Sequence, residues 1–313
     1  MSLTYQITHR TEYRYAEPVG ISHQALRLRP LNTTEQRCLL FNLQVEPEAD
    51  IANPWRDDFG NWVHFCNVRS PCDRLLIESR SSVRVKPPAT LELCGSPAWE
   101  SVRDQLLADL SGDVLSAVPF CFRSPFVPLV PELEIYARKS FDPGRPLLEA
   151  ALDLTGRIHR DFTFDNTATD VSTPVTEVFA ERRGVCQDFA HLQIACLRSL
   201  GLAARYVSGY LRTVPPPGQP RLVGADASHA WVSVWCPGLG WTELDPTNDA
   251  VVADAHVRLA YGRDYGDVAP VRGVMLGGGE QQLAIGVTVA LEGEPLGPAP
   301  VATRRGAAAG SRA

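Results

Sequence analysis

Three residues in the second half of the chain, Cys186, His229 and Asp245, have the types and the order that catalysis by a thiol requires. A nucleophilic cysteine must be held as a thiolate, with an imidazole base beside it and a third group that orients the base. Cys186 opens a predicted helix, and a helix N-terminus both favours a thiolate and offers N–H groups to a developing oxyanion. Gly184 lies two residues earlier and leaves room for close approach to the backbone, so we expect it in substrate binding.

A helix and a hairpin must position these residues. Apolar side chains on several faces predict a buried helix over residues 186–200, with Gly201 in the position of a C-terminal cap. A strand is predicted over 205–211, and two more over 229–236 and 241–245 are joined by a Pro-Gly turn. The predicted base therefore begins one strand of the hairpin, and the orienting acid ends the other.

The register of the hairpin decides whether base and acid can meet. If Trp235 pairs with Trp241 across a five-residue loop, Asp245 lies opposite Trp231 and diagonal to His229 on the same face. A four-residue loop would place base and acid on opposite faces unless a bulge intervened. The triad hypothesis therefore predicts the five-residue loop or a bulge.

Each of these residues also has a structural interpretation. A cysteine at a helix start packs more often than it reacts, and an aspartate before a proline is common at turns. A zinc site built from Cys186, His191, His229 and Asp245 is disfavoured, because the spacing lacks the second Cys or His pair typical of zinc sites, so we predict no metal and no cofactor. Asp188, near the helix start, is expected to satisfy free N–H groups.

Three tryptophans, Trp231, Trp235 and Trp241, fall on one face of the hairpin in this register. Aromatic stripes usually pack in cores, and we assign packing to two of the three. For Trp231, the nearest to His229, two interpretations stay open. It is either a core residue or a substrate-binding wall for the apolar stem of an acyl group.

The composition limits the class of protein. The chain has 313 residues, a formal net charge of −6 and a hydrophobic content of 44%, which is typical of a globular protein of about two domains. Mild acidity argues against a nucleic-acid or membrane partner, since either needs a basic surface. The eight cysteines are scattered, no signal peptide is recognisable and no apolar run is long enough to span a membrane. We therefore expect reduced thiols and a cytoplasmic location.

The pattern along the chain predicts an α+β protein. Alternation of apolar and polar residues, clearest from Tyr5 to Tyr15, predicts a β-sandwich-like N-terminal domain. We divide the chain into this domain over 1–88, a connecting segment with one helix over 89–146, a core over 147–265, a strand segment over 266–292 containing one strand at 282–291, and a tail over 293–313 that is expected to be disordered.

Several motifs carry a resemblance to a known family. They are GVCQDFAH at 184–191, RYVSGY at 205–210, HAWV at 229–232, GW at 240–241 and DPT at 245–247. In these the chain resembles the transglutaminase-like superfamily, and in particular its bacterial branch of candidate cysteine proteases with an N-terminal β-domain. The resemblance covers residues 147–265 with high specificity and residues 1–86 less specifically. The segments DYGDV at 264–268 and PVRG at 270–273 also resemble that branch.

The resemblance implies a papain-like α+β core with a catalytic triad. Cys186 would be the nucleophile, His229 the base and acid, and Asp245 the orienting residue. Attack on a carboxamide carbonyl would give a thioester acyl-enzyme, which water hydrolyses and an amine converts into a cross-link. The family includes calcium-dependent cross-linkers, but no loop of EF-hand spacing supports calcium here. The second oxyanion donor is not assigned by the sequence, and Asn166, Thr167 and Thr169 of the preceding loop are the candidates for substrate contact.

The leading hypothesis is hydrolysis of an amide or isopeptide bond in a peptide or protein, because water is the abundant acceptor. An amine acyltransferase that uses the same triad is the first alternative. A non-catalytic interaction module that keeps the fold is the second, although such a module has no physical need for the three residues.

Overall fold

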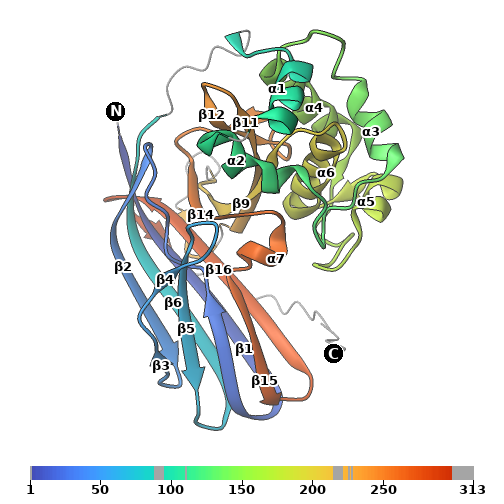
Figure 1. Ribbon diagram of the computed structural model, residues 1–313. Coiled ribbons are helices and arrows are strands. Elements are labelled where there is room, and N and C mark those ends of the chain that lie inside the picture. The colour runs from blue at the N-terminus through green and yellow to red at the C-terminus, as the bar shows by residue number, and fades with distance from the viewer. Residues whose placement is uncertain are drawn as a thin grey trace.

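A computed structural model describes residues 2–87, 95–109, 111–213, 221–224, 226 and 228–297. Figure 1 shows a long β-sheet region in the lower half of the view and a mixed helix-and-sheet region above it. The expected α+β class, with a strand-rich N-terminal domain before a transglutaminase-like core, is confirmed.

The strand-rich region is one antiparallel sheet folded into two layers. Its longest strand, β1 (Leu3–Leu26), pairs with different partners along its two halves: Tyr5 to Arg14 face β6 and β16, whereas Ser22 to Leu26 face β5 and β15. A core that includes Leu26, Cys66 and Ile77 fills the space between the layers. The other strands are β2 (Gln36–Glu46), β3 (Asp50–Ile51), β4 (Trp55–Arg56), β5 (Trp62–Val68), β6 (Cys72–Val85), β15 (Val271–Gly277) and β16 (Gln281–Leu291).

The C-terminal strands belong to this sheet. The sequence predicted one strand over 282–291 in a segment of its own, but β15 and β16 both pair with β1. Strand β15 was missed because its residues are mostly exposed and its partner is about 250 positions away along the chain. The tail expected to be disordered begins at residue 293, but its first residues are described, and β17 (Leu296–Gly297) pairs with β10 (Arg221–Leu222). Residues 298–313 lie outside the described residues.

The mixed region is a five-stranded antiparallel sheet with helices packed on it. Its strands run in the order β13-β12-β11-β9-β14, and α6 packs against β11 and β9. The strands are β9 (Ala204–Leu211), β11 (Ser228–Cys236), β12 (Gly240–Asp245), β13 (Ala250–Val251) and β14 (His256–Gly262), with a separate short pair β7 (Thr163–Phe164) and β8 (Arg183–Gly184). The helices are α1 (Trp99–Ala108), α2 (Gly112–Ala117), a 3-10 helix (Val118–Cys121), α3 (Pro131–Arg138), α4 (Leu147–Asp161), α5 (Val175–Glu181), α6 (Cys186–Ser199) and α7 (Tyr265–Val268).

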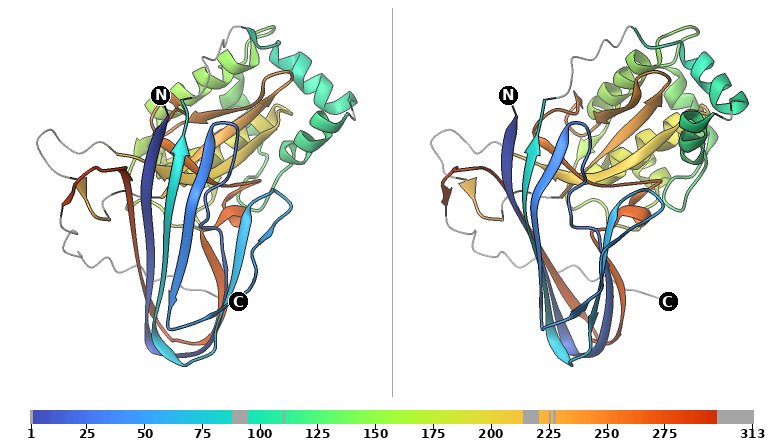
Figure 2. Two further views of the ribbon diagram at one scale, coloured as in Figure 1. Left: turned by 90° about the vertical axis from the view of Figure 1, so that its left-hand side faces the viewer. Right: turned by 60° about the vertical axis from the view of Figure 1, so that its left-hand side comes forward.

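The two regions share a hydrophobic core. Tyr5 and Ile7 of β1 pack with Tyr210 of β9 and Val257 of β14. Polar contacts join the same surfaces, among them a 2.8 Å hydrogen bond from Gln36 Nε2 to the carbonyl of Arg258. Figure 2 shows the open end of the folded sheet lying against the mixed region. The strand-rich region is therefore placed to contribute to any site at this boundary.

Candidate active site

Cys186 is the first residue of helix α6. The helix start is capped by Asp188, whose Oδ2 accepts a 2.8 Å hydrogen bond from the backbone N–H of Val185. Thr169 Oγ1 donates a second hydrogen bond of 2.6 Å to the same oxygen. Burial raises the pKa of Asp188, although these two hydrogen bonds oppose the rise. Asp188 thus has the structural role expected from its position, and it fixes the backbone that carries the thiol.

Gly184 is explained by this cap and not by substrate. A Cβ atom at position 184 would lie 2.7 Å from Asp188 Oδ2 and 2.9 Å from Asp188 Cβ. The residue is buried and does not line the cavity beside Cys186. The expectation that Gly184 contacts substrate is therefore corrected: its missing side chain leaves room for the capping carboxylate.

The hairpin has the register in which base and acid meet. Trp235 pairs with Trp241 and Val232 with Leu244, so the predicted register is confirmed; Cys236 also pairs with Gly240, which shortens the loop itself to residues 237–239. His229 Nε2 lies 2.7 Å from Asp245 Oδ2, and both side chains are buried. The diagonal contact across the strands therefore forms as the period-2 argument predicts.

Asp245 is held by more partners than the sequence indicated. Asn248 Nδ2 donates a 2.7 Å hydrogen bond to Oδ2, and His256 Nε2 lies 3.1 Å from the same oxygen. The backbone N–H of Thr247 donates to Oδ1 at 3.0 Å. Burial favours the protonated acid, but the hydrogen bonds from His229, His256 and Asn248 outweigh it and lower the pKa of Asp245. The acid therefore remains a carboxylate in a buried site.

His256 of β14 reaches Asp245 of β12, although β11 and β9 lie between these two strands in the sheet. Its ring meets the Trp231 ring edge-on, with 5.1 Å between centroids. Gly209 of β9 leaves the space for this contact, since a Cβ there would lie 2.3 Å from the Trp231 ring. No local signal could have revealed His256, because it meets the triad only through the order of the strands in the sheet.

His229 is in an environment that favours its charged form. Burial acts to lower its pKa, but hydrogen bonds to Asp245 and to the Cys186 thiol outweigh burial and raise the pKa to about 10. Two other buried histidines show the effect of burial without a carboxylate partner: the pKa is lowered to about 4 at His9 and to about 3 at His191. The carboxylate therefore makes His229 a cation near neutral pH, next to the thiol.

A cavity of about 280 Å³ lies beside Cys186 and His229. Small side chains of β9 and β11 line one part of it, and Val171, Tyr206 and Tyr265 line another. The strand-rich region supplies His9, Thr11, Tyr13, Leu283 and Ile285, and the remaining lining residues are Val185, Gln187, Ser208, Ser228, Ala230, Pro270 and Val271. None of these is an aspartate, glutamate, lysine or arginine, so the charge at the cavity is confined to the thiol–imidazole pair.

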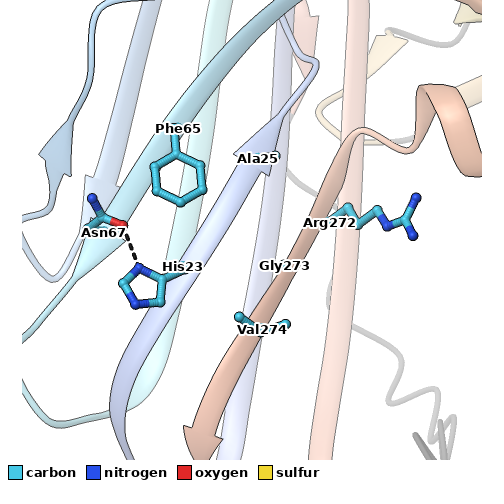
Figure 3. A pocket seen from close by; sticks show the side chains of 7 residues that line it. All are labelled: His23, Ala25, Phe65, Asn67, Arg272, Gly273 and Val274. Carbon is cyan, nitrogen blue, oxygen red and sulfur yellow. Dashed lines mark hydrogen bonds between the residues drawn. The ribbon is translucent and has the colours of Figure 1, made fainter. Parts of the chain in front are cut away.

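A second hollow lies on the surface of the sheet, and Cys186 and His229 do not line it. It measures about 450 Å³ and is lined by residues of β1, β5 and β15 (Figure 3). Its polar contact is a hydrogen bond between His23 and Asn67 beside the Phe65 ring. This open hollow contains no cysteine or carboxylate, so the smaller cavity at Cys186 is the candidate active site.

Three residues expected to contact substrate do not line that cavity. Trp231 is fully buried, and its Nε1 donates a 2.8 Å hydrogen bond to Glu243 Oε2, so it is a core residue that supports His229. Asn166 is exposed in a turn away from the cavity. Thr169 is used in the Asp188 cap. Tyr206 of β9 is buried and lines the cavity.

The side chains nearest to a metal-ligand arrangement are His229, Asp245 and His256. One ligand atom of each lies within 4.8 Å of the others. These atoms are already hydrogen-bonded to one another, through Asp245 Oδ2. His191, part of the zinc set considered from the sequence, accepts a 3.1 Å hydrogen bond from the backbone N–H of Tyr265.

A helix that begins at a cysteine and packs on an antiparallel sheet bearing a histidine and an aspartate is the papain-like α+β arrangement. The chain belongs to the transglutaminase-like superfamily. The family model described as the transglutaminase-like superfamily matches residues 136–246, and the bacterial transglutaminase-like N-terminal region matches residues 5–84.

Similar proteins agree with this assignment. An uncharacterised protein of Mycobacterium tuberculosis is 44% identical over 278 residues, which is 87% of each chain. A protein-glutamine gamma-glutamyltransferase of Pseudomonas aeruginosa is 36% identical over 87 residues, 28% of this chain and 13% of that one. The crystal structure of a candidate cysteine protease from Cytophaga hutchinsonii superposes with a TM-score of 0.71 at 22% identity, covering 93% of this chain and 91% of the other, and shows a shared fold.

Among the helices of the described residues, none has both the length and the apolar character needed to cross a membrane.

Proposed function

We propose that the protein hydrolyses an amide or isopeptide bond in a peptide or protein through a thioester acyl-enzyme. The observation that carries the proposal is the buried contact between His229 and Asp245 next to Cys186, at the edge of a cavity. Asp245 keeps the imidazole oriented and charged. The imidazolium in turn stabilises the thiolate of Cys186, which is the attacking form of a cysteine.

The reaction takes two steps. The Cys186 sulfur forms a bond to the carbonyl carbon, and His229 gives its proton to the leaving nitrogen as the carbon–nitrogen bond breaks, leaving a thioester and a free amine. Water then attacks the thioester while His229 takes its proton, and the carbon–sulfur bond breaks to release a carboxylic acid and the thiolate–imidazolium pair. Asp245 stays ionised throughout and stabilises the imidazolium.

Two groups are proposed to stabilise the oxyanion. The backbone N–H of Cys186 is at the first turn of α6, where N–H groups have no partner within the helix. The second is the Tyr206 hydroxyl, which lines the same cavity, is 2% exposed and has no hydrogen-bond partner among the described residues. Burial, and next the neighbouring Cys186, raise the pKa of Tyr206, so its hydroxyl keeps its proton. The loop residues Asn166 and Thr167 are exposed and do not line the cavity.

Tyr206→Phe tests this assignment, because it removes the hydroxyl and keeps the ring. Acylation of Cys186 by p-nitrophenyl acetate passes through an oxyanion and should slow by about 100-fold, as is typical when one oxyanion donor is lost. Alkylation by iodoacetamide forms no oxyanion and should keep its rate. Tyr265→Phe, at another tyrosine that lines the cavity, is the matched control for the ring environment. Equal acylation rates in the Tyr206 variant and the parent protein would remove Tyr206 from the mechanism.

The proposed reaction itself is tested with a mixture of synthetic peptides that carry glutamine, asparagine or an isopeptide-linked lysine. Mass spectrometry should detect addition of water or replacement of an amide by an acid, in the parent protein and not in Cys186→Ala or His229→Ala. If Cys186 is also as slow to alkylate as the fully buried Cys196, no working thiolate–imidazole pair exists and the non-catalytic interaction module becomes the better account.

An amine acyltransferase is the second candidate, and the Pseudomonas aeruginosa relative named as a protein-glutamine gamma-glutamyltransferase favours it. The two reactions share the thioester and differ in the acceptor. Adding a fluorescent primary amine such as dansylcadaverine separates them, because a transferase attaches the amine to the peptide whereas a hydrolase leaves its product unlabelled.

We also propose that the protein acts in a reducing compartment such as the cytoplasm. The seven described cysteines are all free, which supports this location.

A further inference from the structure

The strand-rich region forms one wall of the cavity at Cys186. Thr11 pairs with Ile285 and Tyr13 with Leu283 across strands β1 and β16, so these four side chains form a continuous patch on one face of the sheet. This patch, the inner-face patch, therefore comes from regular strand pairing and not from loops. Its position is set by the same two strands that anchor the region to the catalytic part.

The two β16 residues of the inner-face patch, Leu283 and Ile285, are apolar and exposed, whereas the second half of the strand is covered. Along β16, Val287 and Val289 are fully buried in the shared core. Ile285 and Leu283 lie on the same face of β16, two and four residues before Val287. Their side chains are 55% and 38% exposed, respectively. Burying apolar surface is favourable, and here the surface faces a cavity next to a nucleophile. An apolar group of a bound molecule would cover it.

The lining of the cavity is unfavourable for binding a charged group. Its lining contains no aspartate, glutamate, lysine or arginine. His9, the histidine on this wall, has ring nitrogens 2.9 Å from Tyr210 Oη and 3.0 Å from Thr11 Oγ1, and burial lowers its pKa to about 4. It is therefore neutral at physiological pH and has no spare hydrogen-bonding atom. Apart from the His229 imidazolium, which is already paired with Asp245 and Cys186, a charged group placed here would lose its water without gaining a partner.

The size of the cavity limits what enters it. A volume of about 280 Å³ is just under the range of about 300–1,000 Å³ usual for pockets that enclose a drug-sized ligand. It suits one side chain or a short acyl segment. The small side chains of Ser208, Ser228 and Ala230 on β9 and β11 leave this space free.

We propose that the inner-face patch is a subsite for the acyl side of the substrate, and that it binds an uncharged, apolar side chain next to the carbonyl group that Cys186 attacks. The location of that carbonyl rests on the proposed function. The strand-rich region thereby has a role in substrate selection: it favours apolar residues beside the scissile bond and rejects acidic and basic ones.

The test uses alkylating probes that differ in the group they carry. Rates of Cys186 alkylation by iodoacetamide, N-butyl iodoacetamide and iodoacetate are measured by peptide mass spectrometry. Burial of each methylene is worth about a fourfold gain in rate, so a butyl probe that buries about two of its carbons should react roughly tenfold faster than iodoacetamide. Iodoacetate, which is anionic, should be the slowest after correction for its intrinsic reactivity toward a free thiol.

Variants test whether the inner-face patch causes the preference for the butyl probe. Ile285→Ser should reduce the ratio of the butyl rate to the iodoacetamide rate several-fold, and Ile285→Val should retain most of it. Leu276→Ser is the matched control, since Leu276 is 69% exposed on β15 but does not line the cavity. Equal rates for the butyl probe and iodoacetamide in the parent protein, or an unchanged ratio in Ile285→Ser, would overturn the subsite.

A binding experiment keeps this test independent of the proposed function. Ligand-observed NMR measures binding of the unreactive N-hexylacetamide to Cys186→Ala, and binding should weaken several-fold in the double variant that adds Ile285→Ser. If the thiol proves inert to iodoacetamide but this binding is seen, the proposed function fails and the subsite stands. If the thiol reacts in a His229-dependent manner but neither probe depends on Ile285, the subsite alone fails.

Discussion

Replacing Asp245 with asparagine removes the carboxylate charge that faces His229 and keeps the size of the side chain. Without that charge, burial is expected to bring the pKa of His229 down from about 10 toward the values of about 4 and 3 at the buried His9 and His191. A histidine with a pKa near 4 is about 0.1% protonated at pH 7, so the thiolate loses its cation. Cys186 then has no imidazolium beside it and is expected to lose the reactivity that such a cation gives to a cysteine.

The expected result is a loss of roughly 10- to 100-fold in the rate of Cys186 alkylation at pH 7, because a cysteine without a cationic neighbour is mostly protonated at that pH. The shape of the pH profile should also change. The parent protein should react at a nearly constant rate between pH 6 and 8, whereas Asp245→Asn should gain about tenfold for each pH unit in this range. Iodoacetamide at several pH values, with peptide mass spectrometry of Cys186, measures both quantities.

The control is Glu243→Gln, which changes another buried carboxylate of the same strand, one that contacts Trp231 and Arg258 instead of the triad. It should keep the flat profile of the parent protein. A flat profile and an undiminished rate in Asp245→Asn would show that the carboxylate does not maintain the charge on His229, and the electrostatic account of the site would be wrong.

Three further results are expected. His256→Phe removes one hydrogen bond to Asp245, so the pKa of that carboxyl rises, the acid limb of the alkylation profile moves to higher pH, and turnover falls by about tenfold. Gly184→Ala forces Asp188 away from the helix start and should lower the free energy of unfolding in urea by about 1–3 kcal/mol. His229→Ala removes a group whose pKa is raised on folding from 6.5 to about 10. The stability lost should be largest below pH 6.5, roughly 3–5 kcal/mol, and should shrink as the pH rises through 10.

Each of these predictions has an outcome that would contradict it. An unchanged acid limb in His256→Phe would mean that this histidine does not influence Asp245. Gly112→Ala is the control for Gly184→Ala, because a Cβ at position 112 meets no atom within 4 Å; equal stabilities for the two variants would contradict the steric argument. A stability difference for His229→Ala that stays constant from pH 6 to pH 10 would mean that His229 is not charged in the folded protein.

Local signals determined much of the site. Period-2 alternation and the length of the turn between β11 and β12 placed His229 and Asp245 on one face, and the contact depends on only those two strands. The start of α6 at Cys186 and the cap by Asp188 follow from interactions within a few residues. These features were predictable because the residues that decide them lie close together in the sequence.

Other local patterns correctly predicted the direction in which a residue faces, but they could not indicate which residues pack against it. Trp231 is on the face of the hairpin that carries His229, as predicted, but Glu243 and His256 cover it completely. Gly184 is required for close approach, as a glycine at such a position suggests, but the group that approaches is Asp188 and not a substrate. In both cases periodicity gives the direction of a side chain without saying what packs there.

By itself, the sequence determined the order of Cys186, His229 and Asp245 and the helix and hairpin that present them. Tertiary structure alone decided that His256 of β14 reaches Asp245 of β12 with β11 and β9 between the two strands, and that β1 and β16 build a wall of the cavity. These contacts join residues separated by up to about 280 positions along the chain, as in the pairing of Tyr5 with Leu291. Their partners are chosen by the order of strands in the folded sheets, which short-range patterns do not encode.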